Sequence, residues 1–177
     1  MLTLCNSILQ SDCLVVGIRK HFVYPIFRVA STSLIAESQR SYLNKEIQRE
    51  CADIQIFIRD PEARFISGVN KYSRQHGIGV QDTWEKACND KLVNRHFVPQ
   101  YIWLVHLRKY YNGLVTLRPF SDVDLFTEKH RGHETKDKKT PVDIPRKFVD
   151  VDFKLLKLIN KSIELDEIVR RFKNEMS

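Results

Sequence analysis

Short apolar runs alternate with amphipathic stretches along most of the chain, and this pattern predicts strands and helices in turn. Runs rich in β-branched and aromatic residues predict strands at 13–18, 22–27, 53–58 and 114–117. Helical spacing of apolar residues is expected from 33 to 43, from 61 onward, over 82–92, over 99–111 and near the C-terminus. Strands that alternate with helices indicate an α/β fold with a mostly parallel central sheet flanked by helices.

Two stretches near the C-terminal end differ sharply in polarity. Residues 127–140 contain almost no apolar side chain, so they are expected to form a mobile loop. In the last helix one apolar stripe should face the core, formed by Leu165, Ile168, Val169 and Phe172. The sequence shows no internal repeat and no sign of a second domain, so residues 1–177 are expected to form a single domain.

The composition narrows the class of partner more than the class of fold. The formal net charge is +7 and the pI is about 9.3, which favours a phosphorylated or polyanionic partner. The four cysteines are scattered without a C-x-x-C pair, so a metal or redox role is not indicated. With no signal-peptide pattern and no apolar run of membrane-spanning length, we expect a soluble, cytoplasmic protein without a membrane span.

The first candidate binding segment is a loop in which an apolar run gives way to small hydroxylated residues. It reads Tyr-Pro-Ile-Phe-Arg-Val-Ala-Ser-Thr-Ser-Leu over residues 24–34. Backbone N–H groups and hydroxyls at such a turn can bind an anion, and Arg28 adds positive charge. The Walker string of nucleotide triphosphatases is absent from the chain. An ordinary serine-rich N-terminus of a helix would show the same sequence pattern.

A second loop of the same kind follows about thirty residues later. A buried strand ends at Arg59, Asp60 is a suitable N-cap, and Pro61 suits the first turn of a helix that carries Ser67. Helix N-termini attract anions through free N–H groups and the helix dipole. Two such loops in one small chain predict a ligand with two separated phosphate-like groups.

Together the two loops resemble the sulfotransferases that use 3′-phosphoadenosine-5′-phosphosulfate (PAPS), most closely the carbohydrate-sulfotransferase branch. The resemblance rests on Arg-Val-Ala-Ser-Thr-Ser-Leu at 28–34, on Arg-Asp-Pro-x-x-Arg-Phe-x-Ser at 59–67, and on a similar His-x-x-Pro-Gln segment at 96–100. It covers roughly residues 24–100 and implies a P-loop-like sulfotransferase fold. It also implies PAPS as donor, 3′-phosphoadenosine-5′-phosphate (PAP) as product, and a hydroxyl acceptor, either a carbohydrate or a small molecule.

Site roles follow from the resemblance, position by position. The first loop would hold the 5′-phosphosulfate side of the donor, and Arg59 and Ser67 would hold its 3′-phosphate. The residues that match the first loop are Arg28, Ala30, Ser31, Thr32 and Ser33. Arg28 stands where the family usually has lysine; it keeps the positive charge but is not a proton donor at neutral pH.

The implied reaction is an in-line displacement at sulfur, in which fixed cations and N–H groups stabilise the growing charge. It requires no metal, and the chain offers no carboxylate cluster for one. A general base would activate the acceptor hydroxyl. His96 is the first candidate because it lies in the family-like segment, and Glu37 is the second.

Two other classes of function, and a non-catalytic variant of this one, are weighed against this interpretation. A basic nucleic-acid-binding module is suggested by the charge and by four aromatic residues, although their helical spacing favours core packing. These residues are Tyr101, Trp103, Tyr110 and Tyr111. A kinase is disfavoured because the Walker lysine and a magnesium carboxylate are missing. A non-catalytic protein that binds PAP or another nucleotide is also considered.

Overall fold

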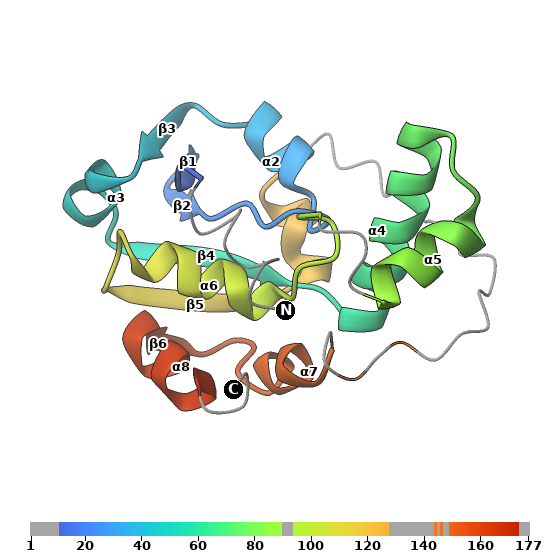
Figure 1. The fold of residues 1–177 in the computed structure, drawn as a ribbon. Coiled ribbons are helices and arrows are strands. Elements are labelled where there is room, and N and C mark those ends of the chain that lie inside the picture. Colours follow the sequence, from blue (N-terminus) through green and yellow to red (C-terminus); the bar gives the residue numbers. More distant parts are fainter. Residues whose placement is uncertain (1–10, 90–93, 128–143, 145, 147–148, 174–177) are drawn as a thin grey trace.

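A computed structural model of the chain describes residues 11–89, 94–127, 144, 146 and 149–173. They form a single α/β domain around a six-stranded sheet, in the spatial order β3-β1-β2-β4-β5-β6 (Figure 1). The strands are β1 (Leu14–Ile18), β2 (His21–Val23), β3 (Arg40–Leu43), β4 (Asp53–Ile58), β5 (Leu114–Pro119) and β6 (Ser162–Glu164).

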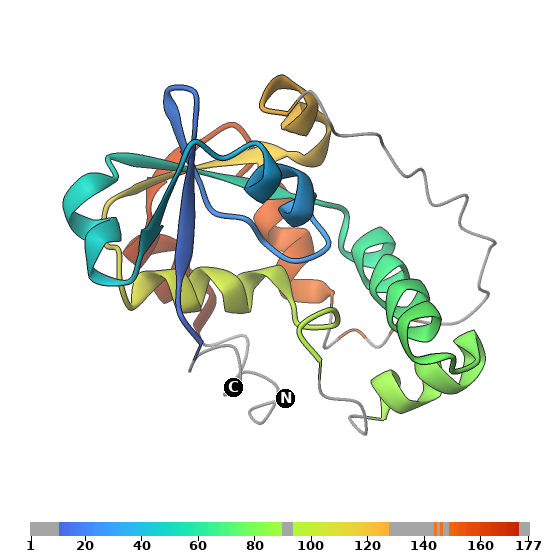
Figure 2. The same ribbon diagram turned by 90° about the horizontal axis from the view of Figure 1, so that it is seen from above.

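Helices flank this sheet, and two of them extend well beyond it. They are α2 (Ser31–Ala36), α3 (Lys45–Glu50), α4 (Pro61–His76), α5 (Val80–Cys88), α6 (Gln100–Arg108), the 3₁₀ helix η1 (Phe120–Leu125), α7 (Asp150–Leu156) and α8 (Leu165–Phe172). Helices α4 and α5 project together to one side, whereas α6 runs along the sheet and packs against α7 and α8 (Figures 1 and 2). No helix in the described part of the chain is both long and apolar enough to cross a membrane.

The sheet is mixed, so the prediction of a mostly parallel sheet is wrong. Only β2, β4 and β5 run parallel to one another, while β1 is antiparallel to β2 and β3, and β6 is antiparallel to β5. The cause lies in the two-residue turn at Arg19 and Lys20, which joins β1 to β2. Arg19 takes a left-handed conformation with φ of 55°, and such a short hairpin can connect only antiparallel strands.

The predicted helix over 33–43 is also wrong beyond its first turns. Helix α2 ends at Ala36, and β3 then pairs with the edge of β1 after the N–H of Gln39 bonds to the carbonyl of Gly17 at 2.9 Å. Two of the apolar residues that suggested the helix are exposed, Ile35 at 42% and Leu43 at 46%. Pairing with the free edge of β1 therefore outweighs a local helical pattern.

The other predicted boundaries agree with the structure, except at the end of β2. β2 stops at Val23 rather than 27, because Pro25 has no N–H to continue the ladder after Tyr24 bonds to Gln55. The strands at 13–18, 53–58 and 114–117, the helices at 61, 82 and 99, and the buried stripe of α8 are confirmed to within a few residues. Apart from Thr127, the predicted loop over 127–140 lies outside the described residues.

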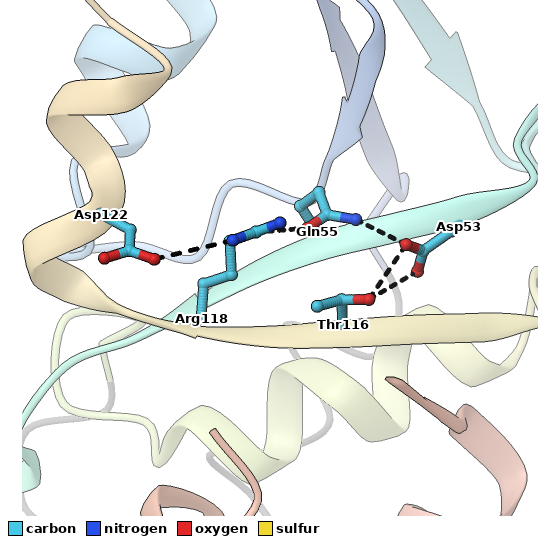
Figure 3. Close-up of polar contacts among 5 residues, drawn as sticks. All are labelled: Asp53, Gln55, Thr116, Arg118 and Asp122. Carbon is cyan, nitrogen blue, oxygen red and sulfur yellow. Dashed lines mark hydrogen bonds and ion pairs between the residues drawn. The ribbon is translucent and has the colours of Figure 1, made fainter. Parts of the chain in front are cut away.

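One face of the central strands carries a polar row whose members satisfy one another (Figure 3). The hydroxyl of Thr116 donates to Asp53 at 3.0 Å, Gln55 Nε2 donates to Asp53 at 2.7 Å, and Arg118 Nε donates to Gln55 Oε1 at 2.5 Å. Arg118 also forms an ion pair with Asp122 at 3.7 Å. These contacts link β4 to β5, and they compensate the positive charge of Arg118.

Substitution of Asp60 tests the N-terminal boundary of α4. Asp60 Oδ1 accepts the N–H of Ala63 at 2.8 Å, and Pro61 occupies the first turn. Asp60→Ala should lower the free energy of unfolding by about 1 kcal/mol, since a free helix N–H loses its acceptor. Urea denaturation with an unchanged slope measures this. Asp60→Asn keeps the acceptor oxygen and should stay near wild type; an equal loss in both variants would exclude the capping oxygen as the cause.

Candidate functional site

The site lies where two neighbouring parallel strands end. β2 and β4 pair in parallel through Val23 and Gln55, so the segments that follow them leave the same edge of the sheet. Residues 24–30 lead from β2 into α2, and Arg59 and Asp60 lead from β4 into α4. The ends of parallel strands in an α/β sheet are where binding loops collect.

The first loop contains two non-glycine residues in the left-handed region. Arg28 has φ of 65° and Ala30 has φ of 54°, each at a cost of about 1 kcal/mol or more. Ala30 is the N-cap of α2, and its carbonyl accepts the N–H of Leu34 at 3.0 Å. Ser31 is buried, Ser33 is partly buried and Thr32 is exposed. Because α2 has only six residues, its dipole contributes less than the sequence suggests.

Three of the predicted site residues, one from the first loop and two from the second, meet in one cluster. Arg28 Nη2 donates to Ser67 Oγ across 39 residues of sequence, and Ser67 is almost fully buried. Arg59 Nη1 lies 3.4 Å from the carbonyl oxygen of Arg28, and the Arg59 guanidinium carbon lies 5.0 Å from the ring centre of Phe120. Two segments that were predicted to hold opposite ends of a donor are thus in direct contact.

Arg64 belongs to this cluster and was not among the predicted site residues. Its side chain is 2% exposed, and its Nε donates to the carbonyl oxygen of Phe27 at 3.1 Å. Its Nη2 has no hydrogen-bond partner among the described residues. Burial, helped by Arg28 and Arg59 and opposed by Asp152, lowers the pKa of Arg64 to about 10, so it remains charged at neutral pH. The sequence feature that could have identified Arg64 is its position three residues before Ser67, because residues three apart lie on the same face of a helix.

Positive charge accumulates here with little compensation. Burial, followed by the charges of Arg59 and Arg74, lowers the pKa of Arg28. Like charges in one partly buried site repel, and an anion relieves that repulsion. Five cations near the cluster take part in no ion pair within the described part of the chain, namely Arg28, Arg64, Lys71, Arg74 and Arg95.

His96 lies beside this cluster, next to the helix that carries Ser67. Its carbonyl oxygen approaches Gly68 so closely that a Cβ at that position would lie 2.5 Å away. Its ring meets Phe27 edge-on, with centroids 5.9 Å apart, and its buried Nδ1 has no partner among the described residues. Burial, and then Arg28 and Arg95, lower the pKa of His96 to about 4. The ring is therefore neutral at pH 7, as a general base must be.

Glu37 is not brought into the cluster. It is the C-cap residue of α2, at the opposite end of that helix from Ala30. Its Oε1 is buried and has no partner among the described residues. Its role as a second candidate base remains a prediction. Among the described residues no group of three acidic, histidine or cysteine side chains is arranged to hold a metal.

The aromatic residues that suggested nucleic-acid binding lie mostly in the core. Tyr101, Trp103 and Tyr111 are buried, and Tyr110 is half-buried beside His106. Trp103 stacks on Phe27 with centroids 5.4 Å apart, and the guanidinium carbon of Arg95 lies 4.2 Å from the ring centre of Phe27. Of the four rings, Trp103 contacts the first loop, and the burial of Tyr101, Trp103 and Tyr111 confirms the interpretation as core packing.

The depressed pKa of His96 predicts a specific acid sensitivity. The unfolded chain binds a proton at His96 near pH 6.5, and the folded chain only near pH 4. Protons in this window therefore favour unfolding. Because solvent screens part of the effect at this partly exposed ring, the free energy of unfolding should fall by roughly 1–2 kcal/mol as pH drops from 6.5 to 4, less than the full shift would give. His96→Gln should flatten this part of the profile in urea titrations. His76→Gln, at an exposed histidine of α4, is the control variant, and an unaltered slope in His96→Gln would contradict the assignment.

The resemblance to sulfotransferases is carried by the two loops and the segment at 96–100. Comparisons with protein-family models, with curated proteins and with solved structures find no match to the chain. Membership of that family is therefore a proposal, supported by the contacts of Arg28, Arg59 and Ser67.

Proposed function

We propose that the protein binds PAPS in the arginine cluster and transfers its sulfuryl group to a hydroxyl acceptor. One observation carries the proposal: Arg28 of the first loop donates to Ser67 of the second motif, with Arg59 beside them. A sulfotransferase-like donor site needs these two motifs side by side. The positive charge of the site also supports the proposal, because neither Arg28 nor Arg64 forms an ion pair with the described residues.

The binding roles are those that the resemblance assigns. Arg59 and Ser67 take the 3′-phosphate through charge-assisted and hydroxyl hydrogen bonds. The turn at 30–33 takes the 5′-phosphosulfate side, with Arg28 between the two. A single ligand that carries both groups could contact both segments, because Arg28 of the first loop is hydrogen-bonded to Ser67 of the second motif.

Residues of this chain can stabilise the leaving group and accept the proton that the transfer step releases. The acceptor oxygen forms a bond to sulfur while the bond from sulfur to the bridging phosphate oxygen breaks, and PAP leaves with that electron pair. Arg28 stabilises the charge on the leaving group without giving up a proton. His96 accepts the hydroxyl proton. Donor phosphates would offset the charge of Arg28, raise the pKa of His96 from about 4 and so make it a stronger base.

A non-catalytic protein that binds PAP is the second candidate, and one observation favours it. Arg28 Nη2 donates to Ser67, a residue of the motif that the resemblance assigns to the 3′-phosphate. In that orientation Arg28 adds to donor affinity more than to catalysis. Binding and turnover must therefore be measured separately. The acceptor class, a carbohydrate or another small hydroxyl compound, follows only from the resemblance.

Donor binding can be tested by thermal unfolding. PAP at a hundredfold excess over its dissociation constant should stabilise the fold by about 2.7 kcal/mol and raise Tm by several degrees. Arg59→Ala should weaken PAP binding at least tenfold, because a charged phosphate contact is lost. Arg49→Ala, on α3 and paired with Glu50, is the matched control. A shift with magnesium and ATP but none with PAP would refute the proposal in favour of a kinase.

Turnover can be tested with radiolabelled PAPS and a panel of sugar, phenol and steroid acceptors. We expect transfer to at least one hydroxyl class. His96→Ala should lower kcat by about a hundredfold, the usual scale of general-base catalysis, while PAP affinity stays within twofold. His76→Ala should have full activity. PAP binding without transfer to any acceptor would instead support the non-catalytic candidate.

A further inference from the structure

Gln100 holds the backbone of Arg59 from both sides. The N–H of Arg59 donates to Gln100 Oε1 at 2.9 Å, and Gln100 Nε2 donates to the carbonyl oxygen of Arg59 at 2.9 Å. A carboxamide that meets both groups of one residue acts like one unit of a neighbouring strand. Gln100 is fully buried, so this pairing is shielded from competition with water.

The pairing replaces a strand partner at the point where the sheet ends. The last pair between β4 and β5 is Ile58 with Pro119, and proline has no N–H to offer. Arg59, the next residue, follows the end of the β4 ladder. Gln100 supplies an acceptor for the N–H and a donor for the carbonyl of Arg59 at this point. The amide of Gln100 therefore helps to fix the backbone position from which the Arg59 side chain extends.

Asp152 fixes Gln100 in turn. One carboxylate oxygen accepts the N–H of Gln100 at 2.6 Å, and the other accepts the N–H of Tyr101 at 2.8 Å. Both N–H groups lie in the first turn of α6, where a helix supplies no acceptor of its own and where the N-cap residue Pro99 makes no side-chain cap. The carboxylate is 1% exposed and comes from α7, far along the chain. A buried route thus runs from α7 through the N-terminus of α6 to Arg59.

We propose that Gln100 and Asp152 are positioning residues that aim Arg59 at the 3′-phosphate of the donor and so make the site selective for 3′-phosphorylated nucleotides. This inference rests on the proposed function, because it presumes that Arg59 binds that phosphate. Neither residue touches the ligand. Their effect is transmitted through the backbone of Arg59, so it should vanish when the Arg59 side chain is removed.

The test is a double-mutant cycle read by calorimetric titration of the full chain with PAP and with 5′-AMP, which lacks the 3′-phosphate. Gln100→Met should weaken PAP binding about tenfold and leave 5′-AMP binding within twofold. In the Arg59→Ala background, Gln100→Met should change PAP affinity less than twofold. Gln55→Met is the matched control, since Gln55 is also a buried glutamine, within β4, but its side chain bonds Asp53 and Arg118 instead of the backbone of Arg59 (Figure 3).

Two further variants keep the test decisive if Gln100→Met does not fold. Gln100→Glu can accept from the Arg59 N–H but cannot donate to its carbonyl, and Asp152→Asn turns one acceptor oxygen into a donor. Both should show the same selective loss of PAP affinity. Additive effects with Arg59→Ala, an equal loss of 5′-AMP binding, or the same loss in Gln55→Met would overturn the inference alone. Failure of the wild type to bind PAP would overturn the proposed function together with it.

Discussion

A guanidinium group withdrawn from water holds the two loops of the site together. Arg64 sits on α4, yet its Nε donates to the carbonyl of Phe27 in the preceding loop. Burying a charge is costly unless it is paired or hydrogen-bonded, so the chain is constrained to bring that carbonyl within reach. Phe27 directly precedes Arg28. The left-handed backbone of Arg28 turns the chain toward α2. Helix α4 and the first loop are therefore set against each other by one buried cation.

The same constraint explains why the free site is electrostatically unfavourable. Elsewhere on the sheet, Arg118 is matched by Asp122 and Gln55. At the loop cluster, burial and mutual repulsion lower the pKa values of Arg28 and Arg64 instead. A protein that keeps such charge largely uncompensated gives up stability that an anionic ligand would restore. The contrast between the two regions marks the loop cluster as the place where a ligand is expected.

Local chemistry made part of the structure predictable from sequence. Asp60 and Pro61 mark the start of α4, and this signal alone puts Arg59 at a strand end and Ser67 on a helix. The hairpin at Arg19 and Lys20 carries none of the glycine or asparagine signals of such turns, which hid the antiparallel pairing of β1 and β2. β3 was missed because only pairing with β1 makes it a strand. Nothing local could link Gln100 to Asp152, since tertiary packing alone joins them.

These long-range contacts also bear on how the protein acquires its site during folding. Arg28 reaches Ser67 over 39 residues, Gln100 reaches Arg59 over 41, and Asp152 reaches Gln100 over 52. Each closes a long loop, so these contacts lose more chain entropy than any helix turn does before they contribute energy. A nascent chain that has emerged only through α6 carries both loops but lacks the carboxylate that anchors α6. The contact between Asp152 and Gln100 should thus form late, when α7 docks, and a ribosome-bound fragment that ends at α6 would contain both loops without this contact.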